Sequence, residues 1–309
     1  VEGKTVDADA HFISSIRQLT EPLEQLCPVV LTQDLVARGL RGEVSDLRAK
    51  ILQAYEAVAA GKDVVLIGGS GSLGDGAFLG ISGTRIIKEL RAPVLLVHSY
   101  LNEVCVDCIL NAKEILGDHL MGTVINRVTP QNLLEVEQMV VPFLVSKNIE
   151  VMGVLPLDRV LDAITVRQMT EVLDGKVICA HEGLDEFVER FSVGAMDADA
   201  ALGYFRKLPN KAVITGGHRA DIQLAALETS TKCIVLTGDQ MPNEIIISRA
   251  RELRVPMISV HYDTLTTVEK LEGMLGRIRI REERKIQRAR ELLRDRLNFR
   301  RIIEKLGLK

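Results

Sequence analysis

Short apolar runs, rich in β-branched residues, recur along the chain and alternate with longer amphipathic stretches. The runs are continuous rather than alternating in polarity, which is typical of strands buried on both faces. They lie at residues 29–31, 64–67, 94–97, 122–125, 151–154, 177–179, 212–215, 233–237 and 257–260. Stretches with helical period lie between them at 43–60, 102–116, 131–147, 220–229, 242–253 and 266–276. Strands that alternate with helices predict an α/β fold built on mostly parallel sheets.

The alternation breaks at residues 182–205, and a shorter α/β pattern follows. We therefore expect a doubly wound, mostly parallel domain over residues 1–182 and a smaller α/β domain over residues 183–309. The stretch 279–306 predicts a long charged helix with an apolar stripe, which must pack on the second domain or on a partner subunit. We expect a homo-oligomer, most simply a homodimer. The stripe consists of Ile286, Ala289, Leu293, Ile302, Ile303 and Leu306.

Composition narrows the class of protein. Hydrophobic residues make up 47% of the 309 residues and charged residues 26%, as in soluble globular proteins. No apolar run has the length of a membrane span, and no signal peptide opens the chain, so we expect no membrane partner. The five scattered cysteines favour a reducing cytoplasm over a disulfide framework.

Charge and ring content argue against a nucleic-acid partner. Aromatic residues are 4% of the chain and tryptophan is absent, whereas stacking on bases needs rings. The net charge is −3, although residues 276–309 alone carry +8. A basic tail can bind nucleic acid or an acidic membrane. We favour the simpler interpretation, a solvated helix face.

Three features of the first domain suggest nucleotide chemistry. A glycine-rich run at 68–76 follows a predicted strand, and its residues Gly69, Ser70 and Gly71 could present N–H groups to a phosphate; a surface loop without a ligand is an equal alternative. Asn126 follows another strand, where its amide could contact a base edge or cap a turn. Asp9, in the sequence DADA, could hold Mg²⁺ or belong to a charged turn.

Together these stretches resemble the dethiobiotin synthetase-like P-loop family over residues 1–182. The resemblance is carried by TVDADAHFI, CPVVLTQDL, KDVVLIGGSGSL, LRAPVLLV, LMGTVINRVTPQ and GVLPLDRVLDAITV. It implies a P-loop NTPase-like fold whose first strand and P-loop lie ahead of Val1, an adenine nucleotide with Mg, a metal near Asp9 and a base near Asn126. One departure matters: Gly68 stands where family enzymes carry a metal-binding Glu, which weakens any inference of ATP-dependent ligation.

In the second domain, small polar residues follow three successive strands. Because the carboxyl ends of parallel strands meet at one edge of a sheet, we expect these residues to line one crevice. Arg219 and the glycine turn before it suit an anion such as a nucleotide phosphate. Asp263 would then contact a ribose hydroxyl or hold Arg219. The predicted set is Gly216, Gly217, Arg219, Thr237, Gly238, Asp263, Thr264, Thr266 and Thr267.

This stretch resembles the DRTGG domain. GGHRADIQLAALE corresponds to the G-D-R-x-D-I signature of that domain, with His218 in place of its acidic residue, and VLTGDQMP and YDTLTT match later segments. A dethiobiotin synthetase-like domain followed by a DRTGG domain is similar to the non-catalytic N-terminal part of long bacterial phosphate acetyltransferases. The transacetylase domain of those enzymes has no counterpart within residues 1–309.

The resemblances imply two functions. The first, which we favour, is a regulatory protein without catalytic residues that senses a nucleotide or another phosphorylated small molecule. The alternative is an ATP- and Mg-dependent ligase of the dethiobiotin synthetase type acting on a carboxylate. None of the six histidines stands with a nucleophile and a carboxylate in a triad pattern, so we assign no catalytic residue.

Overall fold

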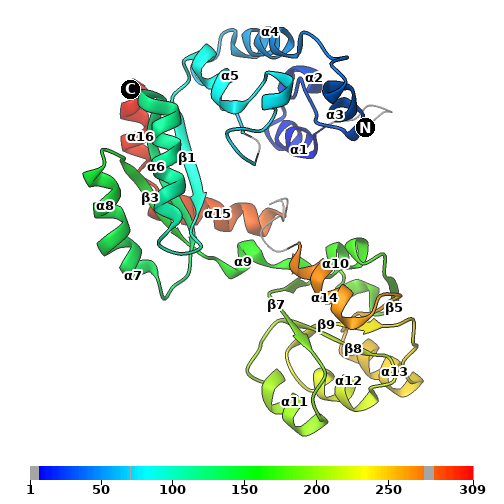
Figure 1. The fold of residues 1–309 in the computed structure, drawn as a ribbon. Coiled ribbons are helices and arrows are strands. Elements are labelled where there is room, and N and C mark those ends of the chain that lie inside the picture. The colour runs from blue at the N-terminus through cyan, green and yellow to red at the C-terminus, as the bar shows by residue number, and fades with distance from the viewer. Residues whose placement is uncertain (1–6, 70, 275–281, 309) are drawn as a thin grey trace. The chain divides into compact units, whose positions relative to one another are not determined.

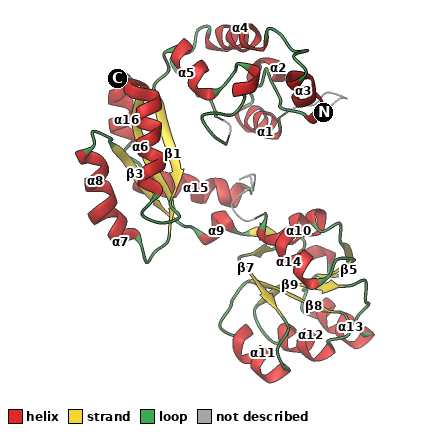
Figure 2. Cartoon of the chain, in the orientation of Figure 1, coloured by secondary structure: helices red, strands yellow, loops and turns green. Residues whose placement is uncertain are grey.

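The computed structural model of the chain describes residues 7–69, 71–274 and 282–308, which divide into two compact units (Figure 1). Unit 1 comprises residues 1–157 and 290–309, and unit 2 comprises residues 158–289. Each unit has its own sheet and helices (Figure 2), so the α/β class with parallel sheets is confirmed. The first compact unit ends at residue 157, whereas the sequence pattern placed a domain boundary near residue 183.

Unit 1 opens with a helical segment. Side chains just ahead of its helices accept backbone N–H groups of the first turn, which satisfies donors that a helix leaves unpaired: Asp7 accepts from Asp9 and Ala10, Thr32 from Leu35, and Ser82 from Arg85. The helices are α1 (Ala8–Arg17), α2 (Leu23–Leu26), α3 (Gln33–Leu40), α4 (Leu47–Ala59), the 3₁₀ turn η1 (Ala77–Leu79) and α5 (Gly83–Leu90).

The sheet of unit 1 has three parallel strands in the order β1 (Val94–Ser99), β2 (Leu120–Val128) and β3 (Val151–Pro156). Helical segments connect them, and their apolar faces form a core with the strands around Ile109, Ile125 and Leu144, each 0% exposed. The connections are α6 (Cys105–Leu116), η2 (Gly117–His119), α7 (Leu133–Glu135), the π-helical turn η3 (Val136–Val140) and α8 (Val141–Ser146).

Two predicted strands of the first domain, 29–31 and 64–67, are wrong: both segments are described, and neither is a strand. In the second segment, Leu66 is 92% exposed and Ile67 is 54% exposed. A strand needs a neighbour to pair its N–H and C=O groups. Within the described residues, the sheet of unit 1 ends at β1, so neither apolar run has a hydrogen-bonding partner.

The C-terminal stretch forms two helices instead of one. Helix α15 (Glu283–Arg296) begins in unit 2 and ends in unit 1, and Asn298 then caps α16 (Phe299–Lys305) by accepting from the N–H of Arg301. The last residues pack on β3: Asn298 N–H donates to Met152 O (2.8 Å), and Leu297 bridges Gly153. The residues from 290 onward therefore pack on unit 1, contrary to the prediction that the stripe packs on the second domain.

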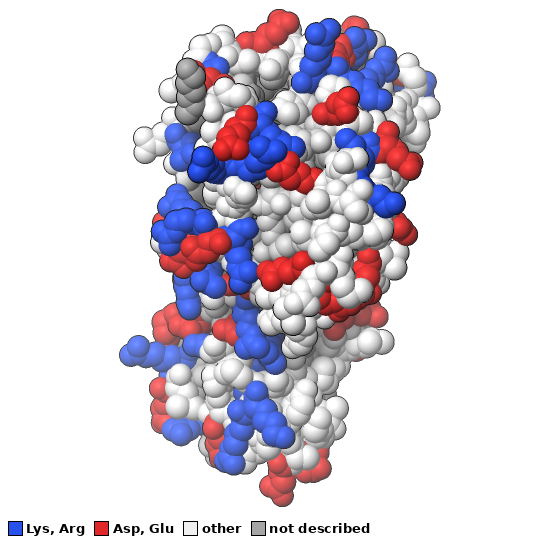
Figure 3. All heavy atoms as spheres, turned by 90° about the vertical axis from the view of Figure 1, so that its left-hand side faces the viewer, with Lys and Arg blue, Asp and Glu red and all other residues white. Residues whose placement is uncertain are grey.

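The charges of this tail are largely matched by acidic partners. Glu150, just before β3, pairs with Arg301 (2.5 Å) and Lys305 (2.7 Å), and Arg296 pairs with Glu137 (3.3 Å). Figure 3 shows basic and acidic side chains interspersed over the face of the molecule that it presents. None of the helices in the described ranges is both long and apolar enough to span a membrane.

Unit 2 contains a five-stranded sheet in the order β5-β10-β9-β8-β7, in which β7 to β10 are parallel and the edge strand β5 is antiparallel. The strands are β5 (Lys176–Cys179), β7 (Arg190–Val193), β8 (Lys211–Gly216), β9 (Thr231–Thr237) and β10 (Met257–Val260), beside a small pair, β4 (Ile164–Thr165) and β6 (Phe187–Val188). The helices are α9 (Arg159–Asp162), α10 (Val166–Val172), η4 (His181–Gly183), α11 (Ala198–Phe205), α12 (Ala220–Leu227), α13 (Glu244–Glu252) and α14 (Thr264–Glu272).

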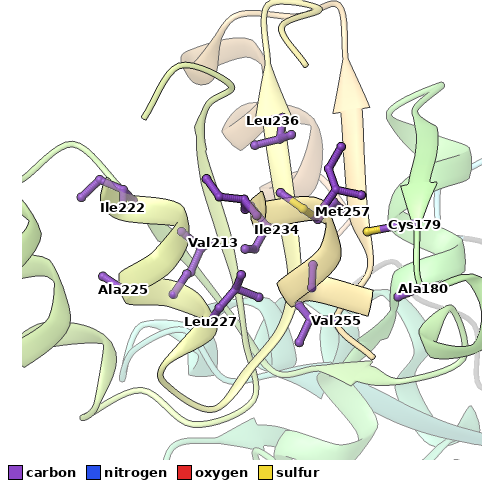
Figure 4. Close-up of a cluster of buried hydrophobic side chains, with 14 of the residues drawn as sticks. Cys179, Ala180, Val213, Ile222, Ala225, Leu227, Ile234, Leu236, Val255 and Met257 are labelled. Atoms are coloured by element: carbon purple, nitrogen blue, oxygen red, sulfur yellow. The ribbon is translucent and has the colours of Figure 1, made fainter. Parts of the chain in front are cut away.

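Both faces of this sheet are buried. Val213 and Ile234 pack in one cluster, shown in Figure 4 with Ile222 and Leu227 of α12, whereas Ile214 packs in a second cluster. Successive strand residues point to opposite faces, so covering both faces requires apolar residues at every position. This explains the continuous apolar runs of the sequence.

Lys211, at the start of β8, is an unusual member of this interior because its side chain is 0% exposed. Its Nζ donates to Thr229 Oγ1 (2.8 Å) and to Ser230 O (3.2 Å), and it lies 5.4 Å from the centre of the Phe205 ring. None of these partners is anionic. Burial lowers the pKa of Lys211 to about 8, since a low-dielectric interior disfavours the charged form.

We therefore expect the free energy of unfolding to rise between pH 8 and pH 10.5. Below pH 8 both states carry the ammonium charge and folding bears the full burial cost; above pH 8 the folded state loses its proton first, so the cost disappears by pH 10.5. The gain should reach about 3 kcal/mol at most. Urea unfolding of the wild type and of Lys211→Met across this range measures it.

Lys232→Met, in neighbouring β9, is the matched control because its ammonium is partly exposed and pairs with Glu186 (2.6 Å). The wild type and Lys232→Met should show the same rise, and Lys211→Met should lack it. An equal pH dependence in Lys211→Met would contradict the assignment.

Candidate functional site

A cavity of about 330 Å³ lies at the carboxyl ends of the parallel strands of unit 2. Four residues of the predicted set line it together: Gly216, Arg219, Thr237 and Thr264. They come from the loops after three different strands and meet because parallel strands place their carboxyl ends at one edge of the sheet. A crevice in this position is the common ligand site of open α/β sheets.

Arg219 is held in place by its own loop and by the neighbouring one. Its Nε and Nη2 donate to the two carboxylate oxygens of Asp221 (3.0 and 2.9 Å), and Nη2 also donates to Met196 O in the loop after β7 (2.7 Å). Arg219 lowers the pKa of Asp221 and has its own pKa raised in return. Within the described residues, no protein partner uses its Nη1. The guanidinium is thus anchored at the pocket with one nitrogen available to an anion.

The pocket also has hydroxyl and amide groups. Thr237 Oγ1 and Thr264 Oγ1 lie 3.1 Å apart, so the side chains at the ends of two strands share a hydrogen bond. His218 Nδ1 lies 2.8 Å from Gln240 Oε1, which links the loop after β8 to the loop after β9. These groups offer both donors and acceptors to a polar ligand.

The other predicted residues of this domain have structural partners. Asp263 caps α14 by accepting from Thr266 N (3.0 Å) and Thr266 Oγ1 (2.8 Å), and these hydrogen bonds lower its pKa. Thr267 is 0% exposed and donates to Asp263 O (2.7 Å). Gly238 turns the chain with φ of +76°, a conformation that glycine adopts readily. Asp263 is therefore not the partner of Arg219, which pairs with Asp221.

Gly217 lies where two loops meet. A Cβ at this position would stand 2.2 Å from Gln240 O, so only glycine allows the loop after β8 to approach the loop after β9 so closely. Gly217 itself does not line the cavity, but it holds together the two loops that do.

Sequence reasoning missed the wall of the pocket formed by Val193, Gly194 and Ala195. They follow β7, in the stretch interpreted as a break in the α/β rhythm. A usable signal was present: RFSV is followed by a glycine and then by Asp197, which caps α11, the same order that follows β8. Gly194 is needed for packing, since a Cβ there would stand 2.3 Å from Ile222 Cγ2.

In unit 1, the predicted site residues lie in three separate elements. Asp9 is exposed in the first turn of α1, Gly69 and Gly71 lie in the loop before η1, and Ser70 is outside the described residues. In the same loop, Asp75 accepts from Ser72 N (3.0 Å) and Ser72 Oγ (2.7 Å). No three His, Cys, Asp or Glu residues among those described are grouped to hold a metal ion.

Asn126 lies at a β-bulge near the end of β2. The register of β2 with β3 shifts between Ile125 and Val128, and Arg127 has φ of +62°. Asn126 Oδ1 accepts from Arg127 N (2.9 Å), so the side chain supports this local turn. Bulges re-aim side chains at strand ends. The role of Asn126 near a base remains a prediction.

Comparison with known protein families identifies both parts of the chain. The sequence model of an AAA domain matches residues 1–165, and that of the DRTGG domain matches residues 168–274. The chain is similar to phosphate acetyltransferases of Synechocystis sp. (26% identity over 257 residues) and Pseudomonas aeruginosa (23% over 291 residues). These alignments cover 78% and 86% of this chain, but only 37% and 41% of the two enzymes.

Two further similarities concern shorter segments. An uncharacterized protein of Bacillus subtilis, YtoI, is 30% identical over 106 residues, which are 34% of this chain and 23% of that protein. A crystal structure of the CBS and DRTGG domains of the regulatory region of Clostridium perfringens pyrophosphatase, complexed with diadenosine tetraphosphate, aligns with a TM-score of 0.33 and 18% identity. That alignment covers 48% of this chain and 73% of the other.

The close approach at Gly217 gives a stability prediction. Gly217→Ala should lower the free energy of unfolding by about 1–3 kcal/mol, because the new Cβ overlaps the Gln240 carbonyl and the backbone must shift. Gly203→Ala, in α11, is the control: its Cβ would meet nothing within 4 Å, and the change should stabilise the helix by about 0.5–1 kcal/mol. Chemical denaturation measures both. A Gly217→Ala protein as stable as Gly203→Ala would show that the loops do not meet as described.

Proposed function

The chain belongs to the AAA domain family through residues 1–165 and carries a DRTGG domain at residues 168–274; from this we propose that it is a regulatory protein that binds a nucleotide in the pocket of unit 2. The relatives that cover most of the chain are phosphate acetyltransferases, and the chain spans about two fifths of their length. The activity of those enzymes is therefore not transferred to it. We propose instead that ligand binding regulates a partner or an assembly of this chain.

The observation that carries the proposal is the anchored guanidinium of Arg219 beside a glycine turn and two threonine hydroxyls. Asp221 and the Met196 carbonyl fix its plane, so little side-chain entropy remains to be lost when an anion binds. A phosphate can accept from Nη1, and hydroxyl groups of the ligand can bond to Thr237 and Thr264. A nucleotide or another phosphorylated small molecule offers both kinds of group.

An adenine nucleotide with its Mg²⁺ is the ligand we propose to test first. No cluster of acidic side chains for a metal exists among the described residues, so Mg²⁺ would arrive on the phosphates of the nucleotide. We also propose a cytoplasmic homo-oligomer. All five cysteines are free, and Phe299 and Ile303 of α16 are 46% and 42% exposed.

We expect Arg219→Ala to weaken ATP binding by about 1.5–3 kcal/mol, the range for a hydrogen bond to a charged group. Isothermal titration of the full chain with MgATP and with diadenosine tetraphosphate measures the affinity, and circular dichroism monitors the fold. Arg249→Ala is the matched control because Arg249 is exposed on α13 and pairs only with Glu252. Its affinity should equal that of the wild type.

Two results would contradict the proposal. If no nucleotide binds the wild type, or if Arg219→Ala and Arg249→Ala bind equally, the pocket is not a nucleotide site. Sustained ADP release from MgATP in the presence of carboxylate substrates would instead favour the ligase alternative.

A further inference from the structure

Gln223, in α12, lies beneath the glycine turn of the pocket and is 0% exposed. Its side-chain Nε2 donates to two consecutive backbone carbonyls, Gly216 O and Gly217 O, each at 3.0 Å. One primary amide has two N–H donors, so these two bonds use its full donor capacity. The turn after β8 is therefore tied to the first turns of α12 by a single buried side chain.

These two bonds set the direction of the turn. In a trans peptide unit the C=O and the N–H point in opposite directions. With the Gly217 carbonyl held toward Gln223, the N–H of His218 must point away from it. Among the described residues, no hydrogen bond uses the His218 N–H, and His218 lines the cavity. The following residue is Arg219, whose guanidinium lies at the same cavity.

The oxygen of the same amide shows what the side chain is for. Gln223 Oε1 is buried and has no hydrogen-bond partner, which costs free energy that an apolar side chain of equal size would avoid. The side chain therefore contributes through its two donors. On the other side of the turn, Gly217 packs against the Gln240 carbonyl, so the turn is fixed from both sides.

We propose that Gln223 is a positioning residue of the ligand site: its amide holds the turn Gly216–His218 so that the His218 N–H and Arg219 face the phosphate of the ligand. This inference rests on the proposed function. It adds a requirement that the pocket alone does not impose, because Gln223 does not line the cavity and need not touch the ligand.

The test replaces the donors without changing the size of the side chain. Gln223→Met has no donor, and Gln223→Glu places a carboxylate against two carbonyl oxygens. We expect the dissociation constant for MgATP to rise at least tenfold in Gln223→Met, and further in Gln223→Glu at pH 8. As the pH falls toward 5.5, the buried carboxyl gains a proton and with it one donor. The affinity of Gln223→Glu, relative to the wild type at each pH, should therefore recover.

Gln168→Met is the matched control. Gln168 also holds backbone in unit 2: its Oε1 accepts from Thr165 N (3.0 Å), and its Nε2 donates to Glu282 (2.9 Å), but it does not line the cavity. This variant should lose stability and keep its affinity for MgATP. A loss of affinity in Gln168→Met equal to that in Gln223→Met would reduce the effect at Gln223 to general destabilisation and would overturn the proposal.

A second measurement needs no variant and applies even if Gln223→Met fails to fold. In ¹⁵N-resolved spectra of the wild type, MgATP should shift the His218 backbone amide proton downfield and slow its exchange with water. If MgATP binds with Arg219-dependent affinity but the His218 amide does not respond, or if a folded Gln223→Met binds within twofold of wild type, Gln223 has no positioning role and the proposed function stands. If the wild type binds no nucleotide, both fail together.

Discussion

The pairing of β8 with β7 on one side and β9 on the other is the constraint on which the rest of unit 2 depends. All of its backbone groups along Lys211–Gly216 must find partners, and two parallel neighbours provide them. Parallel pairing requires the chain to cross back over a face of the sheet after each strand, which is why α11, α12 and α13 separate β7, β8, β9 and β10. The same pairing places three strand ends beside one cavity.

Close approach of backbones then decides the shape of that cavity. Gly194 and Gly217 allow neighbouring segments to come within distances that a Cβ would prevent. Between these contacts, Arg219 is fixed by Asp221 and by the Met196 carbonyl, and the glycine turn is fixed by Gln223. Each side chain at the cavity is thus held by groups that lie behind it, so a ligand would meet a largely prearranged surface.

Unit 1 illustrates the same constraint from the opposite direction. Its three strands form a continuous core, and the return of the chain at Leu297 and Asn298 adds contacts to β3. Within the described residues nothing pairs with the open edge of β1. The apolar segment at 64–67 remains exposed, although its composition is that of a buried strand. Apolar composition is therefore not sufficient for a strand without a neighbour to bond to.

By itself, the sequence determined the α/β class, the strands from β1 to β3 and β8 to β10, and the two resemblances, because burial period and motif order are local properties of a chain. It also indicated that Gly216, Arg219, Thr237 and Thr264 would meet, since the geometry of parallel sheets is general. Only the tertiary structure decided that Arg219 bonds to Asp221 instead of Asp263, that β7 supplies a wall of the pocket and that Gln223 lies beneath the turn. Each of these depends on which segments become neighbours in space, and hydrogen bonds and close backbone contacts between them leave no period in the sequence.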